Sequence, residues 1–199
     1  ESKYAFHFEQ ELPLTKIMEF DVKCIAEDFD VSNKEAFISF AESVNSEFSS
    51  VDMLFNNAGV TLIDSVKDQS FEDFHWIMNI NFWGVVYGSH AFLPFLQKSP
   101  RAHLVNVSSV FGLLSLPGQS AYNSSKFAVR GFTEALKMEM AGTNVSVHCV
   151  HPGGIKTNIS NNAKVTSKSI SKSQNVENFN KLAKTTPEEA ADVILQGLV

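Results

Sequence analysis

HLVNV (103–107), SAYNSSKFAVRGFTEALKMEMA (120–141) and VSVHCV (145–150) form the stretch of sequence that decides the fold. The first and last segments are short apolar runs, as buried strands are, and the middle segment has helical spacing and is followed by Gly142. A strand, a helix and a second strand of these lengths predict a βαβ unit, which belongs to a parallel sheet. We therefore expect an α/β protein.

The same alternation extends toward the N-terminus. The runs 22–31 and VDMLF (51–55) predict two further strands. Between them, Ser32 and Glu35 match a capping box at the start of a helix. This helix carries apolar residues at helical spacing, which predict one buried face: Phe37, Phe40, Ala41, Val44 and Phe48.

Two more helices complete the expected organisation. Ser70 precedes a long helix that Pro94 bends or ends, and its apolar face holds Phe74, Ile77, Met78, Val85 and Gly88. A capping box at 186–189 starts the last helix. We expect a single domain over residues 1–199, with a mobile substrate loop in the polar stretch 158–184.

The composition excludes several classes of function. Of 199 residues 44% are hydrophobic, and 16 basic against 22 acidic residues give a net charge of −6. This acidic balance argues against nucleic acid or an anionic membrane as the main partner, and no apolar run approaches the ~18 residues of a membrane span. Cys24 and Cys149 stand alone, and residues 1–10 show no export signal. We therefore expect reduced thiols, no metal site and a cytoplasmic location.

Small and polar residues follow three predicted strands at their carboxyl ends. VDMLF runs into NNAG (56–59), HLVNV into SS (108–109) and VSVHCV into HPGG (151–154). Any one of these segments alone is an ordinary turn. Because ligands bind outside the carboxyl ends of an open parallel sheet, the three together predict a ligand crevice.

Tyr122 and Lys126 stand four residues apart, on one face of the predicted 120–141 helix. A free tyrosine has a pKa of about 10, and a nearby ammonium lowers that pKa by favouring the phenolate. The pair is a candidate acid–base centre, although this spacing also arises by chance. Asn81, on the apolar face of the long helix, is either a structural hydrogen-bonding residue or a functional one.

Taken together and in this order, the motifs resemble the short-chain dehydrogenases/reductases. The resemblance rests on NNAG (56–59), Asn81 in MNINFWG, Ser109 after VNVS, Tyr122-x-x-x-Lys126, Pro152-Gly153-x-x-x-Thr157 and Asp30, 26 residues before Asn56. It covers the chain from about residue 22 to its end and is specific as a joint pattern. It implies a Rossmann-type doubly wound parallel sheet and an oxidoreductase that uses NAD or NADP.

The resemblance also implies a role for each matching residue. Tyr122 would be the general acid or base between a secondary alcohol and a ketone or aldehyde, and Lys126 would lower its pKa and hold the nicotinamide ribose. Ser109 would orient the reacting oxygen, and Asn81 would hold a water that links Lys126 to a proton relay. The other matching positions would contact the cofactor: Asp30, Val31, Asn57, Ala58, Gly59, Pro152, Gly153, Ile155 and Thr157.

The N-terminal part of the chain departs from the family's pattern. Its first glycine is Gly59, so no Gly-rich phosphate-binding turn precedes the Asp30 strand. Residues 3–8 supply at most one strand, and the sheet is expected to be incomplete at the N-terminus. We expect the Asp30 strand to have no neighbour and the VDMLF strand to have an open edge. Either these residues are part of a longer enzyme, or the chain is a degenerate relative.

Two interpretations of the function stay open. In the first, the protein is an enzyme for a small apolar alcohol or ketone, because Val110, Phe111, Leu113, Leu114 and Leu116 stand between Ser109 and Tyr122. In the second, it is a dinucleotide-binding, regulatory or structural subunit without turnover. The resemblance further implies a homodimer or homotetramer that packs through the helices containing 71–97 and 120–141.

Overall fold

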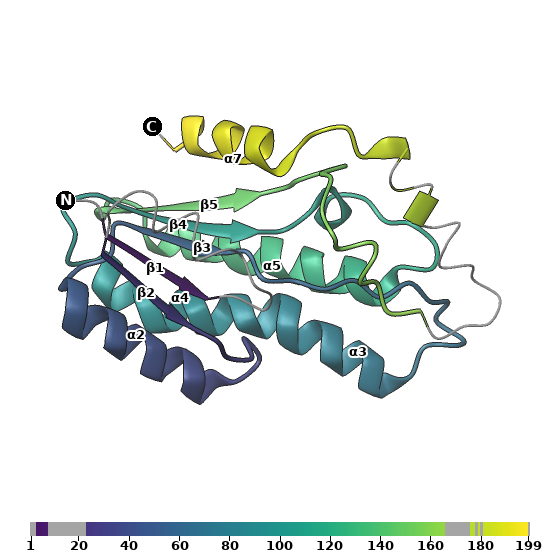
Figure 1. Ribbon diagram of the computed structural model, residues 1–199, viewed down its shortest axis with the longest axis horizontal. Coiled ribbons are helices and arrows are strands. Elements are labelled where there is room, and N and C mark those ends of the chain that lie inside the picture. Colours follow the sequence, from purple (N-terminus) through teal and green to yellow (C-terminus); the bar gives the residue numbers. More distant parts are fainter. Residues whose placement is uncertain (1–2, 8–22, 166–175, 178, 180, 199) are drawn as a thin grey trace.

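The computed structural model describes residues 3–7, 23–165, 176–177, 179 and 181–198. Its strands form two parallel sheets (Figure 1). The two-stranded sheet holds β1 (Lys3–His7) and β2 (Lys23–Glu27), and the three-stranded sheet has the order β3 (Met53–Asn56), β4 (Ala102–Val107) and β5 (Val145–Val150). The expectation of a parallel α/β protein is confirmed.

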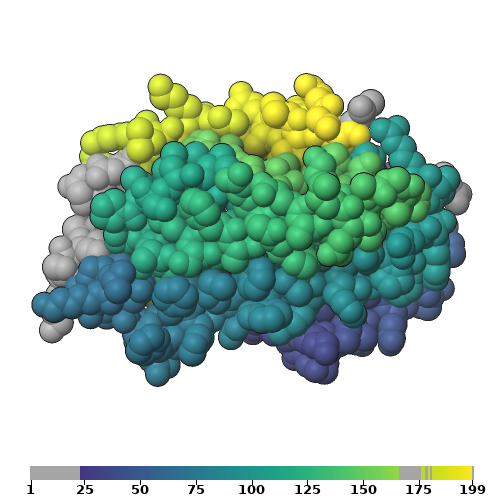
Figure 2. Space-filling model, turned by 180° about the vertical axis from the view of Figure 1, so that it is seen from behind, coloured from purple at the N-terminus to yellow at the C-terminus, as the bar shows by residue number. Residues whose placement is uncertain are grey.

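Helices lie on both faces of the three-stranded sheet. They are α2 (Lys34–Phe48), α3 (Phe71–Met78), α4 (Gly84–Leu96), α5 (Ser120–Glu139) and α7 (Pro187–Gln196). α4 and α5 contact the strands on one face, which Figure 2 shows from outside with α5 in green, whereas α7 runs along the other side (Figure 1). A π-helical turn, η1 (Asn79–Trp83), joins α3 to α4, and a 3-10 turn, η2 (Val110–Gly112), follows β4.

The predicted apolar face of α2 is confirmed, because all five of its predicted residues are buried. They pack against α4, where the Phe40 and Phe92 rings meet edge to face at an interplanar angle of 66° with centroids 5.9 Å apart. The predicted capping box is wrong. Asn33 is the N-cap and accepts a hydrogen bond from the Ala36 N–H at 3.1 Å. The Ser32 N–H instead donates to the Asp30 carboxylate at 2.8 Å, so the turn at Asp30 delays the helix by one residue.

The strand predicted at 22–31 is shorter than expected, because the chain leaves the sheet after Glu27. The expectation that this strand has no neighbour is wrong. β1 pairs with it in parallel from Lys3↔Lys23 to His7↔Glu27, so the backbone groups that each strand turns toward the other have partners. The open edge expected for VDMLF is confirmed within the described residues, where β3 is an outer strand of its sheet.

The remaining helix boundaries follow the sequence closely. Ser70 accepts a hydrogen bond from the Asp73 N–H at 3.0 Å, and the capping box at Thr186 is present. Pro94 lies in the last turn of α4. α5 ends at Glu139, two residues earlier than predicted, and Gly142 turns the chain with a φ of 82°.

The predicted loop 158–184 lies partly outside the described residues. Its described beginning is attached to the rest of the domain, because Ala163 is 2% exposed and Lys164 forms a parallel bridge with Leu62. Lys164 also forms an ion pair with Asp73 of α3. Mobility of this segment stays a prediction.

A buried polar network connects the sheet to the two helices behind it. Asn56 and Asn106 are register partners on β3 and β4, and the Asn56 amide donates to Asn106 Oδ1 at 2.8 Å. Asn56 also donates to Ser89 Oγ of α4 at 3.1 Å, and Asn106 donates to Thr133 Oγ1 of α5 at 3.0 Å. These bonds fix β3, β4, α4 and α5 in one relative register.

We expect Gly88→Ala in α4 to destabilise the protein. A Cβ at this position would lie 2.2 Å from Asn56 Oδ1 and 3.2 Å from Phe37 Cε1, and Asn56 cannot move without breaking its buried hydrogen bonds. The free energy of unfolding should fall by about 1–3 kcal/mol in urea denaturation.

Gly131→Ala is the matched control, because Gly131 lies in α5 with nothing within 4 Å of an added Cβ. The higher helix propensity of alanine should raise the free energy of unfolding there by up to about 1 kcal/mol. Equal midpoints for the two variants would contradict the clash at Gly88.

Candidate functional site

The carboxyl ends of β4 and β5 lie side by side and carry polar residues beyond the last paired strand residues. Val107 and Val150 are register partners. Past them, the Ser108 N–H donates to the Val150 carbonyl at 2.9 Å and the Val110 N–H donates to the Pro152 carbonyl at 2.9 Å. The structure therefore brings the SS and HPGG segments together, and the end of β3 places the NNAG segment at the same edge.

Ser109 and Tyr122 meet at the start of α5. Each is 7% exposed, and the Ser109 hydroxyl lies close enough to the Tyr122 phenol to lower its pKa. Ser109 Oγ also accepts from the Phe111 N–H at 3.1 Å, and the Phe111 ring stands at right angles to the Tyr122 ring with centroids 6.2 Å apart. The hydroxyl and the phenol predicted to act together are therefore in contact.

Lys126 extends from α5 into the protein and is 4% exposed. Its ammonium donates to the Val107 carbonyl at 3.0 Å and lies 5.9 Å from the centroid of the Tyr122 ring. A Cβ at Gly59 would lie 3.4 Å from Lys126 Nζ and 3.2 Å from Asn81 Oδ1. Glycine at position 59 thus keeps the space beside the ammonium open.

Asn81 lies in η1 and is 0% exposed. Its amide nitrogen donates to the Val60 carbonyl at 2.9 Å and to Ser125 Oγ at 3.0 Å, and its oxygen accepts from the Val60 N–H at 2.8 Å. Both N–H groups of the amide are therefore used to hold the segment after NNAG against α5. Asn81 therefore has the structural hydrogen-bonding role, which was one of the two roles expected from the sequence. Its predicted role of holding a water next to Lys126 stays a prediction.

Burial shifts the pKa values of the central pair in opposite directions. It raises the pKa of the Tyr122 phenol above its ordinary value, against the opposing effect of the Ser109 hydrogen bond. It lowers the pKa of Lys126 to about 8. That Lys126 lowers the pKa of Tyr122 stays a prediction. In this structure the ammonium is directed at the Val107 carbonyl, and burial is the largest effect on the pKa of the phenol.

The residues expected to contact the cofactor are not equally available. Asn57 and Asp30 are exposed, although the Asp30 carboxylate accepts from the Ser32 N–H. Val31 is 2% exposed, and its side chain packs against Gly84. A Cβ added at Gly84 would lie 3.2 Å from Val31 Cγ2. Little of Val31 is therefore accessible for the expected contact with adenine, which stays a prediction. The other positions lie in the segments after β3 and β5: Ala58, Gly59, Pro152, Gly153, Ile155 and Thr157.

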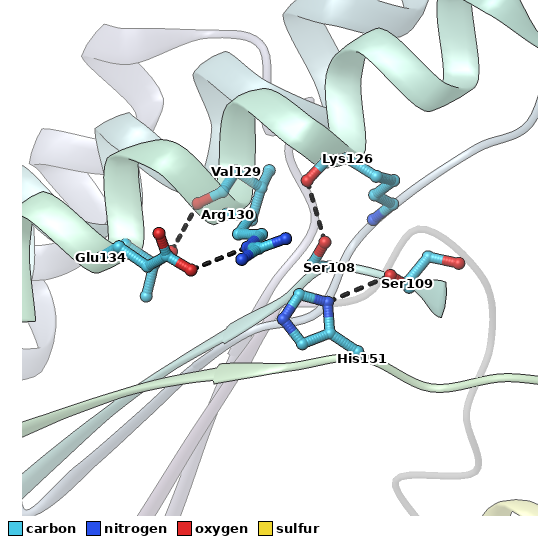
Figure 3. A network of polar contacts seen from close by, with 8 residues as sticks. Ser108, Ser109, Lys126, Val129, Arg130, Glu134 and His151 are labelled. Carbon is cyan, nitrogen blue, oxygen red and sulfur yellow. Dashed lines mark hydrogen bonds and ion pairs between the residues drawn. The ribbon is translucent and has the colours of Figure 1, made fainter. Parts of the chain in front are cut away.

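Two contacts at this site were missed by the sequence reasoning, and Figure 3 shows both. Ser108 Oγ donates to the Lys126 carbonyl at 2.9 Å, and His151 Nδ1 lies 3.1 Å from the Ser109 carbonyl oxygen. Their positions at strand ends were visible in the sequence. Nothing in a single sequence says which side chain at a strand end turns toward its neighbour.

Within the part of the chain that the structure describes, no three His, Cys, Asp or Glu side chains are grouped for a metal ion. None of the described helices is long and apolar enough to cross a membrane.

Comparison with known proteins gives consistent matches. The family model for short chain dehydrogenase matches residues 9–168. The SadH protein of Mycobacterium tuberculosis is 45% identical over 176 residues, which cover 85% of this chain and 62% of SadH. A cyclopentanol dehydrogenase of Comamonas is 38% identical over 128 residues, which cover 64% of this chain and 51% of that protein.

A solved structure matches as well. The short chain dehydrogenase/reductase of Burkholderia phymatum in complex with NAD has a TM-score of 0.71 and 31% identity, and the match covers 94% of this chain and 64% of that one. The chain spans less than two thirds of the length of each of these three proteins.

We expect Lys126→Met to change how the free energy of unfolding depends on pH. Folded Lys126 gives up its proton at about pH 8, against 10.5 in the unfolded chain, so unfolding takes up a proton between these values. The cost of burying the ammonium is fully present below pH 8 and disappears as the pH rises to 10.5, a change of about 3 kcal/mol.

Denaturation at a series of pH values measures this effect. Wild type should gain stability relative to Lys126→Met as the pH rises through this window, whereas Lys137→Met, at an exposed position of the same helix, should follow wild type. A constant difference between wild type and Lys126→Met would contradict the lowered pKa.

Proposed function

The chain belongs to the short-chain dehydrogenase/reductase family, and we propose that the whole protein transfers hydride between NAD or NADP and a small secondary alcohol or ketone. Its fold is the family's Rossmann-type doubly wound parallel sheet. The observation that carries the proposal is the contact of Ser109 with Tyr122 beside a buried Lys126 ammonium. This is a hydroxyl, a phenol and a positive charge in one place, which suits proton transfer to a carbonyl oxygen.

The residues around Lys126 fit the nicotinamide half of such a cofactor. An ammonium has three donors, and Lys126 uses one of them on the Val107 carbonyl, which leaves two for ribose hydroxyls. Gly59 keeps the adjoining space free of a side chain. The described residues contain no Gly-rich turn for the pyrophosphate. When bound, the cofactor supplies or takes up the hydride.

Tyr122 and Ser109 would handle the proton. The raised pKa of Tyr122 keeps its phenol protonated, which is the state that gives a proton to a carbonyl oxygen. Ser109 Oγ accepts from the Phe111 N–H, which orients the hydroxyl beside the Tyr122 phenol, and a bound carbonyl oxygen would accept from both hydroxyl groups. In the reverse direction Tyr122 would take the alcohol proton, and the Lys126 ammonium is the nearby charge that favours the phenolate.

The substrate is proposed to be apolar. Leu113, Leu114 and Leu116 are 48%, 47% and 45% exposed, between the two residues that would bind the reacting oxygen. Apolar side chains beside a few convergent polar groups are typical of small-molecule sites. The name of the Comamonas relative gives cyclopentanol, an apolar secondary alcohol, as the substrate of that protein.

The proposal extends to assembly and to the loop beyond β5. Trp83 and Phe127 are 43% and 40% exposed on η1 and α5, which supports a homodimer or homotetramer that covers these helices. The segment 158–184 would be the substrate loop of the single domain. A cytoplasmic location stays a prediction.

We expect Tyr122→Phe to slow hydride transfer strongly, because it removes the hydroxyl that donates the proton and keeps the ring. In the full-length natural protein kcat with apolar ketones should fall by about 10²- to 10⁴-fold, followed by absorbance of the reduced cofactor. Tyr87→Phe, at a half-buried position of α4 where the ring stacks on Trp83, should retain activity.

Fluorescence titration of the reduced cofactor separates the two interpretations of the function. Binding with turnover that depends on Tyr122 supports the enzyme. Binding without turnover in wild type supports a dinucleotide-binding protein. Turnover that is the same in wild type and Tyr122→Phe would contradict the assigned role.

We expect Leu113→Ser to weaken the binding of an apolar ketone. The loss of a leucine contact should raise KM about tenfold and leave the dissociation constant of the reduced cofactor unchanged. Leu195→Ser in α7 is the control, because Leu195 is 45% exposed, against 48% for Leu113, and lies outside the 113–116 segment. Equal KM values in the two variants would remove the argument for an apolar pocket.

A further inference from the structure

Ser109 lies on a short stretch between β4 and η2, with an extended backbone (φ −164°, ψ 163°). A hydroxyl that orients a reacting oxygen must keep its position, because a displacement of about 1 Å at a reacting centre can cost ~100-fold in rate. The groups that fix Ser109 therefore matter for the reaction as well as for the fold.

Backbone hydrogen bonds surround this residue on both sides. The Ser108 and Val110 N–H groups donate to the carbonyls of Val150 and Pro152, each at 2.9 Å, and the Gly112 N–H donates to the Ser109 carbonyl at 2.8 Å. Main-chain bonds of this kind do not depend on side-chain identity. Substitution of a side chain leaves the groups that make them in place.

The second contact of the Ser109 carbonyl is different, because it comes from a side chain. His151 Nδ1 lies 3.1 Å from the oxygen, and Figure 3 shows the imidazole reaching Ser109 from the end of β5. A carbonyl oxygen only accepts, so Nδ1 carries the hydrogen in this contact. The neutral Nδ1–H form and the imidazolium both donate there, and neither requires a proton transfer during turnover.

We propose that His151 is a positioning residue: its Nδ1–H holds the Ser109 carbonyl, and thereby directs the Ser109 hydroxyl at the reacting oxygen. With the Gly112 N–H, it fills both acceptor sites of that carbonyl. The proposal rests on the proposed function of Ser109 and Tyr122. It predicts that a donor on the δ atom of residue 151 is sufficient, and that the second imidazole nitrogen is not needed.

Three substitutions of His151 test whether a donor on the δ atom is sufficient. Asn places its amide nitrogen at the position of Nδ1, Gln carries its donor one bond farther out, and Leu has no donor. In the full-length natural protein we expect His151→Leu and His151→Gln to lower kcat by about 10- to 100-fold with an unchanged dissociation constant for the reduced cofactor. His151→Asn should recover most of this loss.

The pH profile gives a second readout. The limb that reports Tyr122 should remain in all three variants, because His151 does not exchange the proton. Activity restored by Gln and not by Asn, or loss of a limb of the profile, would overturn the proposal. His148→Leu is the control. It removes an imidazole of β5 whose Nε2 lies 3.2 Å from His103 Nδ1, and it should leave kcat unchanged.

Titration of Tyr122 tests the proposal separately from turnover. Ultraviolet difference spectra of tyrosinate, with Tyr122→Phe as reference, report the pKa that the Ser109 hydrogen bond lowers. Displacement of Ser109 weakens that bond, so His151→Leu should raise the pKa of Tyr122 and His151→Asn should not. An unchanged pKa in His151→Leu would contradict the proposal, whereas absent turnover in wild type would contradict the proposed function alone.

Discussion

The hydrogen bond between the Asn56 and Asn106 side chains is the constraint on which the arrangement of the domain depends. Both amides are buried, and an unpaired buried amide costs about 1–3 kcal/mol. A slip of one residue between β3 and β4 would separate them and would also turn every side chain of the slipped strand to the other face. Ser89 and Thr133 extend the same requirement to α4 and α5.

The proton-transfer residues inherit their positions from this arrangement. Three residues of α5 form hydrogen bonds with other elements. Thr133 bonds to Asn106, Lys126 bonds to the end of β4, and Ser125 bonds to Asn81. Once these are fixed, Tyr122 in the first turn of the helix has little freedom, and it contacts Ser109. The reacting groups are thus held by buried hydrogen bonds that are distributed over three elements of the fold.

Much of this architecture could be predicted from the sequence, because helical and strand spacing are local properties. The stripe of α2, the strands around α5 and the caps at Ser70 and Thr186 were predicted on that basis. The N-cap at Asn33 was not, because Asp30 competes for the turn through its own side chain. The partner of β2 and the direction of the Lys126 ammonium depend on contacts between distant segments, which a single sequence does not contain.

The π-helical turn at Asn79–Trp83 has a consequence for how one continuous helix serves two surroundings. An extra residue in a helix rotates everything after it by about 100°. Before the turn α3 contacts α5, and after it α4 contacts α2 and β3. The turn therefore rotates the packing surface of α4 relative to that of α3. A deletion of one residue within it would keep nearly every side chain, yet it would rotate one of the two surfaces away from its partner.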